Sequence, residues 1–71
     1  MKIVLHSIGE YQLVLFTNKI HPFVVCYTPG ESFYKPGDPI NSWYWGDYYG
    51  DLELALNKLK ERAGIRETEV L

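Results

Sequence analysis

The sequence predicts an α+β fold, a small antiparallel β-meander of three or four strands with one C-terminal amphipathic helix packed on one face. Three short runs of β-branched and aromatic residues, separated by turn signals, occupy the first 28 positions. From Asp51 onward the apolar residues change from an alternating to a helical spacing. The chain has 71 residues, and we expect residues 1–71 to form a single domain.

The first two strands are predicted at residues 2–8 and 11–17, because only Gly9 and Glu10 separate two β-rich runs. Such a two-residue connection is typical of a tight hairpin in which glycine supplies a positive φ. A second turn ends at Pro22, and residues 23–28 form the third strand. Three consecutive strands joined by short turns make a meander.

Residues 29–41 are predicted to form a loop, since Pro29-Gly30 and Pro36-Gly37 interrupt any regular element there. A loop of this length is uncommon in a compact domain, and loops of this kind often carry function. Residues 42–48 are a candidate fourth strand, in which Gly46 indicates a bulge or a close backbone approach.

The helix is predicted at about residues 51–63, followed by a short charged tail at residues 65–71. Its start is indicated by Gly50 or Asp51 as the N-cap, and its end by Gly64, which suits the left-handed position after a helix. The residues that would form its buried stripe share helical spacing: Leu52, Ala55, Leu56, Leu59 and Ala63.

Composition argues against several classes of protein. Seven Lys or Arg against nine Asp or Glu give a net charge of −2, which is not the basic footprint of most nucleic-acid-binding proteins. Cys26 is the single cysteine, so no disulfide can form within the chain. The apolar run after Met1 is too short to span a bilayer or to act as a secretion signal. We therefore expect a cytoplasmic protein with no membrane contact.

The sequence carries no catalytic, metal or phosphate motif. His6, His21 and Cys26 do not stand at a spacing that brings two of them to one site. There is no nucleophile elbow and no P-loop. The carboxylates nearest one another do not match a calcium loop: Asp38, Asp47, Asp51 and Glu53. We expect no enzyme, no metal and no cofactor, and a small enzyme is the least favoured alternative.

Both faces of the predicted sheet are apolar. Alternation assigns Ile3, Leu5, Leu13, Leu15, Phe23, Val25 and Tyr27 to one face, and Val4, Ile8, Val14, Phe16, Val24 and Cys26 to the other. One helix, about 20 Å long, covers about one face of a small sheet. The second face therefore needs another cover. Either the aromatic loop folds back over it, or a second sheet packs on it in a symmetric homodimer, which is the arrangement we favour.

The candidate binding residues are large apolar side chains near the fourth strand, with one leucine on the far side of the helix. They are Phe33, Tyr34, Trp43, Tyr44, Trp45 and Leu54. Tyrosine and tryptophan are enriched at protein interfaces, so these residues predict a non-catalytic interaction module that self-associates or docks on a larger protein. An equally favoured alternative is that these residues fill the core under the loop.

An aromatic β-surface also suits single-stranded nucleic acid, whose bases stack on aromatic rings. That mode of binding normally comes with a positive groove along the phosphates. In the aromatic segment Lys35 stands alone against three carboxylates, those of Asp38, Asp47 and Asp51. Nucleic-acid binding is therefore the alternative rather than the first prediction.

The junction between the fourth strand and the helix has the sequence Trp45-Gly-Asp-Tyr-Tyr-Gly-Asp-Leu-Glu-Leu-Ala-Leu, with Arg62 further along the helix. It resembles a pattern found in small uncharacterised bacterial and phage proteins. In that pattern an aromatic, a glycine and a Tyr–aromatic pair precede Asp-Leu-Glu-x-Ala-Leu at the start of an amphipathic helix. The resemblance covers about a quarter of the chain. It implies a small stand-alone bacterial or phage protein and no particular activity.

Overall fold

The computed structural model describes residues 1–17 and 19–64, and it confirms the predicted α+β fold. Four antiparallel strands form one sheet in the order β1-β2-β3-β4, and a single helix follows them. The predicted tail at residues 65–71 lies outside the described residues. The elements are β1 (Lys2–Ile8), β2 (Tyr11–Phe16), β3 (Phe23–Tyr27), β4 (Tyr44–Tyr49) and α1 (Leu52–Arg62).

The element boundaries lie within two residues of those predicted. β2 and β3 each end one residue early, and β4 begins at Tyr44, so that Ser42 and Trp43 remain in the loop. Gly9 has the positive φ, 61°, that the tight connection between β1 and β2 requires. The strands are joined as a meander, which confirms the predicted topology.

Helix α1 packs across one face of the sheet. Ala55 and Leu59 on the helix are fully buried against Leu13 of β2 and Val25 of β3. The Asp51 carboxylate accepts a hydrogen bond of 2.8 Å from the backbone N–H of Glu53 and so caps the first turn. At the other end Gly64 takes φ 84°, the left-handed conformation predicted for it.

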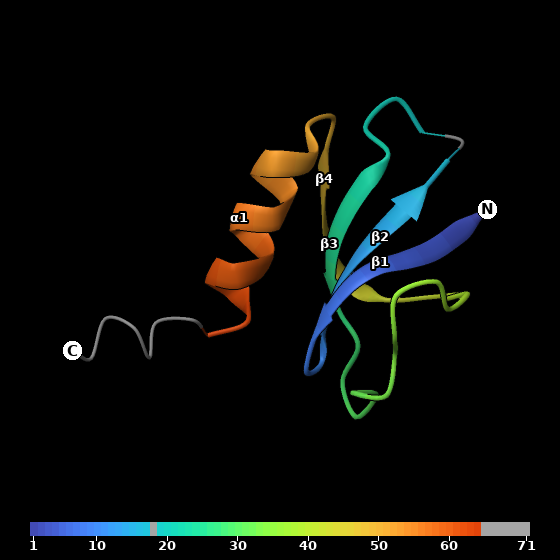
Figure 1. Ribbon diagram of the computed structural model, residues 1–71, viewed down its shortest axis with the longest axis vertical. Coiled ribbons are helices and arrows are strands. Elements are labelled where there is room, and N and C mark those ends of the chain that lie inside the picture. Colours follow the sequence, from blue (N-terminus) through green and yellow to red (C-terminus); the bar gives the residue numbers. More distant parts are fainter. Residues whose placement is uncertain (18, 65–71) are drawn as a thin grey trace.

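The opposite face of the sheet is covered by residues of the same chain, namely the segment between β3 and β4. In Figure 1 this green-to-yellow segment runs on the side of the sheet away from α1. Ile40 of this segment is buried in a cluster with four residues of the sheet: Val4, Val14, Val24 and Cys26. Tyr34 and Trp43 of the segment pack against the same cluster, as does Phe16 of β2. The loop therefore forms the second cover, and the premise that favoured a second copy does not hold.

A bulge in β1 changes which side chains share a face. The register with β2 shifts between Val4 and His6, so Leu5 is the extra residue. Beyond this point the alternation of side chains is reversed, and Ile8 packs with the cluster under α1. The prediction that Ile8 shares a face with Val4 was wrong, because an ideal alternation contains no bulge.

The two edges of the sheet differ. The outer edge of β1 is paired with the loop, since Val4 N–H donates to the Asp38 carbonyl at 2.9 Å and Gly37 N–H donates to the Val4 carbonyl at 2.7 Å. Ile3 and Pro39 form a bridge between them. β4 is the other edge, and no further strand pairs with it in the described part of the chain.

Candidate functional site

The structure divides the six predicted binding residues into two groups. Tyr34 and Trp43 are partly buried and pack on the sheet, so they serve the core of their own chain. Trp43 meets Phe16 edge-on, with ring centroids 5.9 Å apart. The other four side chains are exposed: Phe33 by 65%, Tyr44 by 61%, Trp45 by 70% and Leu54 by 56%.

The exposed group does not form one continuous face. Tyr44 and Trp45 adjoin each other at the start of β4. Leu54 lies in the first turn of α1, whereas Arg62, in the last turn, is the helix residue that contacts Trp45. Eight residues of helix, about 12 Å, separate these two positions. The ring contact of Phe33 is with Tyr34, 4.7 Å away. Tyr44 and Trp45 are therefore the centre of the candidate site.

Trp45 has an unusual backbone conformation. It is the one non-glycine residue with positive φ, 54°, in the described chain. The register between β3 and β4 shifts here, so that Trp45 and Gly46 lie opposite the single residue Cys26, which makes a β-bulge. A left-handed conformation costs a residue with a Cβ about 1–2 kcal/mol. Such strain is found where the surrounding structure requires it, commonly at functional sites.

The bulge places the Trp45 indole at the end of a row of three aromatic rings. The indole stacks on Tyr27, with centroids 5.1 Å apart and planes 7° from parallel. Tyr27 in turn lies 5.0 Å from Tyr11, with the rings tilted by 34°. We call Tyr11, Tyr27 and Trp45 the aromatic row. Because one face of the indole is against Tyr27 while 70% of the residue remains exposed, the other face is open to solvent.

Arg62 fixes the bulge from the last turn of α1. Its Nη1 atom donates to the carbonyl of Trp45 at 2.7 Å, to the carbonyl of Val25 at 3.0 Å and to the Asp47 carboxylate at 3.2 Å. The guanidinium also lies over the Tyr11 ring, 5.8 Å from its centroid. Its side chain is only 17% exposed and the bond to Val25 is partly buried, and the three charge-assisted bonds together join β3 and β4 to the helix.

Glu10 adds a negative charge beside the row. Its carboxylate accepts hydrogen bonds from the Tyr27 hydroxyl at 3.3 Å and from the Gly30 N–H at 2.9 Å. Desolvation first, and the Glu10 carboxylate second, raise the pKa of Tyr27 above its ordinary value. With Glu10, Asp47 and Arg62 charged, the surroundings of the row carry one net negative charge.

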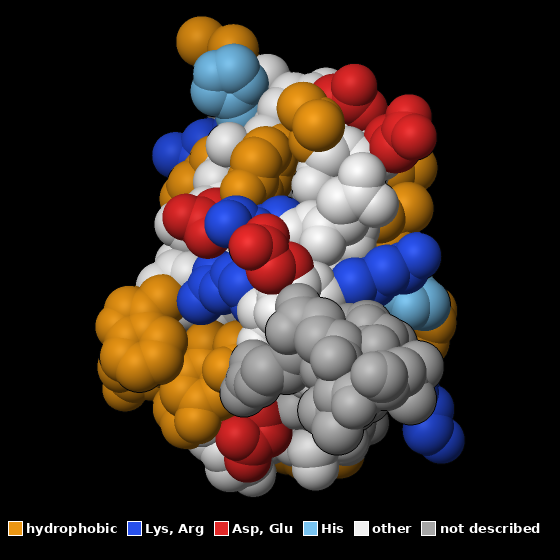
Figure 2. Space-filling view, turned by 90° about the vertical axis from the view of Figure 1, so that its left-hand side faces the viewer, with side chains coloured by type: hydrophobic (Ala, Val, Ile, Leu, Met, Phe, Trp, Pro, Cys, Tyr) orange, Lys and Arg blue, Asp and Glu red, His pale blue; other side chains and the backbone are white. Residues whose placement is uncertain are grey.

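The surface that carries α1 has exposed apolar side chains next to charged ones. In Figure 2 hydrophobic side chains gather at the lower left of that face, beside basic and acidic side chains. The exposed large apolar residues at the start of β4 are Tyr44 and Trp45. An apolar patch bordered by charges is typical of a protein-interaction surface.

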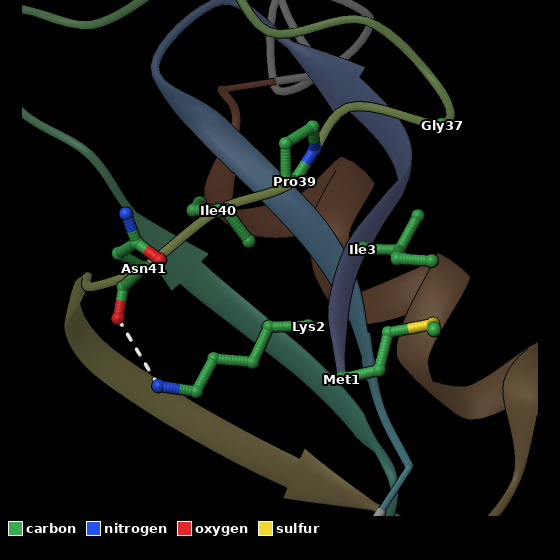
Figure 3. A pocket seen from close by; sticks show the side chains of 7 residues that line it. All are labelled: Met1, Lys2, Ile3, Gly37, Pro39, Ile40 and Asn41. Atoms are coloured by element: carbon green, nitrogen blue, oxygen red, sulfur yellow. Dashed lines mark hydrogen bonds between the residues drawn. The ribbon is translucent and has the colours of Figure 1, made fainter.

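Two shallow hollows offer little chemistry. One, of about 460 Å³, lies where the loop crosses β1, and Lys2 donates there to the carbonyl of Asn41 at 3.2 Å (Figure 3). Its other lining residues are Met1, Ile3, Gly37, Pro39 and Ile40. The second, of about 440 Å³, is lined by Lys19, Ile20, His21 and Tyr48. Neither hollow brings a histidine together with a carboxylate.

Cys26 lies in the core, where burial raises the pKa of its thiol to about 12 although Arg62 acts in the opposite direction. A thiol with this pKa is not a nucleophile near neutral pH. Within residues 1–17 and 19–64, no three His, Cys, Asp or Glu side chains gather where they could hold a metal ion. In the same residues no helix has the length and apolar character needed to cross a membrane.

Comparison of the chain with protein-family models, with curated proteins and with solved structures found no match. The resemblance of the strand-to-helix junction to small bacterial and phage proteins therefore stays a prediction.

The sequence did not identify three participants in the site, Tyr11, Tyr27 and Arg62. The two tyrosines stand in predicted strands, but their contact depends on the pairing of β2 with β3, which places them opposite each other. The sequence indicated Arg62 as one of the basic residues at the end of the helix and as part of the junction pattern, but not as a partner of Trp45. Its position eleven residues after Asp51, on the helix flank that faces β4, follows from where the N-cap starts the helix.

Proposed function

We propose that this protein is a non-catalytic interaction module that docks on a larger protein through Tyr44 and Trp45. Phe33 and Leu54, which are exposed elsewhere, are lesser contacts. A cytoplasmic location, favoured by the single reduced cysteine, belongs to the same proposal.

One observation carries the proposal, which is the exposure of Trp45 in a strained conformation. A glycine would occupy this backbone position without strain. The chain instead has a tryptophan there, whose ring stacks on Tyr27 and whose carbonyl accepts a hydrogen bond from Arg62. A rigid, preformed tryptophan loses little entropy on binding, and tryptophan is prominent among the residues that dominate binding free energies.

Docking on another protein is favoured over self-association because the chain covers both faces of its own sheet. Within residues 1–17 and 19–64, each face of the sheet has its own cover, so burial of a sheet face does not require a second copy. Single-stranded nucleic acid is disfavoured at this surface, since Glu10 binds the tyrosine that supports the exposed ring, Asp47 follows Trp45 by two residues, and both carboxylates would repel phosphates.

The first test replaces Trp45 by asparagine, a residue that tolerates the left-handed conformation. The immobilised protein is used to capture partners from its host, and the affinity of the captured partner is then measured with purified proteins. Because truncation of a central aromatic anchor typically removes 2 kcal/mol or more of binding free energy, we expect Trp45→Asn to weaken binding more than about tenfold.

Phe33→Asn is the matched control, because Phe33 is exposed to a similar extent on another part of the surface. It should change the affinity less than about threefold, as is usual for residues outside the centre of an interface. Equal affinities for Trp45→Asn and the unmodified protein, with both folded, would contradict the proposal. A change in light-scattering mass caused by Trp45→Asn alone would point to self-association instead.

A further inference from the structure

The open face of Trp45 differs from two other aromatic rings of this chain, which already contact a cation. On the loop side of the sheet, Phe16 and Trp43 each lie close to a lysine ammonium group of the same chain. Lys2 and Lys19 each place an ammonium group 5.1 Å from the centroid of Phe16, and that of Lys2 lies 5.6 Å from Trp43. These two lysines are thus engaged at the Phe16 and Trp43 rings, whereas the outer face of Trp45 is open to solvent.

The aromatic row itself already binds a cation at its other end. The Arg62 guanidinium lies over Tyr11, and its Nη1 atom donates a hydrogen bond to the Trp45 carbonyl. The face of an aromatic ring carries partial negative charge and attracts ammonium and guanidinium groups, with tryptophan the strongest acceptor. The row is therefore suited to cations, and one end of it is still available.

Charges around the open end favour a cation over an anion. Glu10 is bound to the hydroxyl of the tyrosine that supports the indole, and Asp47 follows Trp45 by two residues with its side chain 49% exposed. Arg62 neutralises one of these two carboxylates. These three groups together leave one negative charge uncompensated at the aromatic row, so the electrostatic energy is favourable for an approaching cation and unfavourable for an approaching anion.

We propose that the partner contributes an arginine or lysine side chain that stacks on the open face of Trp45, in the net negative field of Glu10, Asp47 and Arg62. This inference rests on the proposed function and names the chemistry of the partner. The occupant is a cationic segment of another protein. A second copy of this chain, an acidic segment and a purely apolar segment are the other possible occupants, and each gives a different result in the test below.

The test uses short peptides that differ in one charge. One peptide carries a single arginine between glycines with both ends blocked, and its control carries citrulline, which has nearly the same shape without the charge. A third peptide carries glutamate. Binding is followed by NMR through the indole N–H signals of the ¹⁵N-labelled protein. The chain has two tryptophans, so Trp43, packed against Phe16, reports changes away from the site in the same spectrum.

We expect the arginine peptide to shift the Trp45 signal in a saturable way and to leave the Trp43 signal nearly unchanged. The citrulline peptide should bind at least about threefold more weakly, the typical size of a cation–π contact at an exposed site. Raising the salt concentration should weaken binding of the arginine peptide and leave binding of the citrulline peptide unchanged. Glu10→Gln, which removes the charge but keeps an acceptor for Tyr27, should weaken binding of the arginine peptide about twofold to fivefold.

Equal binding of the arginine and citrulline peptides would overturn the inference, as would tighter binding of the glutamate peptide. A Trp45 signal that moves with protein concentration, without peptide, would make a second copy the occupant and would also overturn it. Failure of this inference is distinct from failure of the proposed function. If binding of the partner needs Trp45 but is unchanged when the partner's own arginines and lysines are replaced, the docking function stands and only the cationic contact is refuted.

Discussion

Trp45 shows how one residue can be held in a conformation that its own chemistry disfavours. The left-handed backbone costs about 1–2 kcal/mol, and the charge-assisted Arg62 hydrogen bond to the Trp45 carbonyl, which is exposed, contributes at the lower end of the about 1.5–3 kcal/mol typical of such bonds. The two contributions are of similar size. The bulge is therefore stable because the helix supplies a guanidinium at this point, and the stacked indole adds to it.

Cys26 provides a prediction about pH at the residue scale. Its thiol has a pKa of about 12 in the folded protein and an ordinary value of 9.0 when unfolded. Between these values the unfolded chain has lost the thiol proton and the folded chain has kept it. The free energy of unfolding therefore falls as pH rises above 9, by about 1.4 kcal/mol per pH unit from this group, and is unaffected by it below pH 9.

The measurement is urea unfolding at pH 8 and pH 10.5 for the natural protein and for Cys26→Ala. Tyrosines also ionise in this range, and Tyr34, whose pKa is raised by burial and by its hydrogen bond to Glu31, contributes a loss of the same sign in both proteins. The natural protein should lose about 2 kcal/mol more than Cys26→Ala over this interval. Equal losses would show that the thiol is not shielded.

At the scale of elements, β4 is an edge strand that is interrupted rather than regular. Natural edge strands often carry bulges, which hinder pairing with other chains. Here the bulge at Trp45 and Gly46 has that effect, and it also turns an aromatic side chain onto Tyr27. The other edge is protected differently, by the backbone bonds between β1 and residues 37–40.

Gly46 was predicted to mark a bulge or a close approach, and it does both. A Cβ added there would lie 3.0 Å from the Trp43 Nε1 atom and 3.2 Å from Val24 Cγ1. Both neighbours belong to or pack against the buried cluster of the loop side, so neither can move away easily. We expect Gly46→Ala to lower the free energy of unfolding by about 1–3 kcal/mol in urea denaturation, the usual range for overpacking.

A double-mutant cycle with Trp43→Phe separates this clash from the loss of glycine. Phenylalanine lacks the Nε1 atom, so the cost of Gly46→Ala should be smaller by about 0.5 kcal/mol or more when Trp43→Phe is present. Additive effects of the two substitutions would mean that the indole does not limit the space at Gly46.

At the scale of the whole molecule, the described residues of this 71-residue chain cover the two faces of the sheet with one helix and one loop. The sequence predicted the fold because alternation, turn residues and helical spacing all act locally, as at Gly9 and Asp51. It also showed that both faces are apolar. It left open which segment covers the second face, because that depends on where Ile40 and Trp43 fall after a loop whose path no local rule fixes.

The predicted site residues divide into a core group and a surface group for a reason that local sequence rules also miss. Trp43 and Trp45 are two residues apart and equally apolar, yet one packs inward and the other faces solvent, because the bulge at Trp45 and Gly46 interrupts the alternation of side chains along β4. Without the bulge, residues 43 and 45 would point to the same side of a strand. Sequence alone therefore could not separate the core tryptophan from the surface tryptophan.

This division gives the last prediction, which contrasts the two tryptophans in the intact protein. Trp43→Ala should lower the free energy of unfolding by about 2–4 kcal/mol, somewhat less than the cost for a fully buried aromatic, because Trp43 is only partly buried. Trp45→Asn should lower the free energy of unfolding less, since the Trp45 ring is mostly exposed.

Light scattering should give the 8.3 kDa mass of a single chain for the natural protein and both variants, because each sheet face is already covered. Twice that mass for the natural protein, lost in Trp43→Ala without unfolding, would mean that the loop opens to let two sheets pack together.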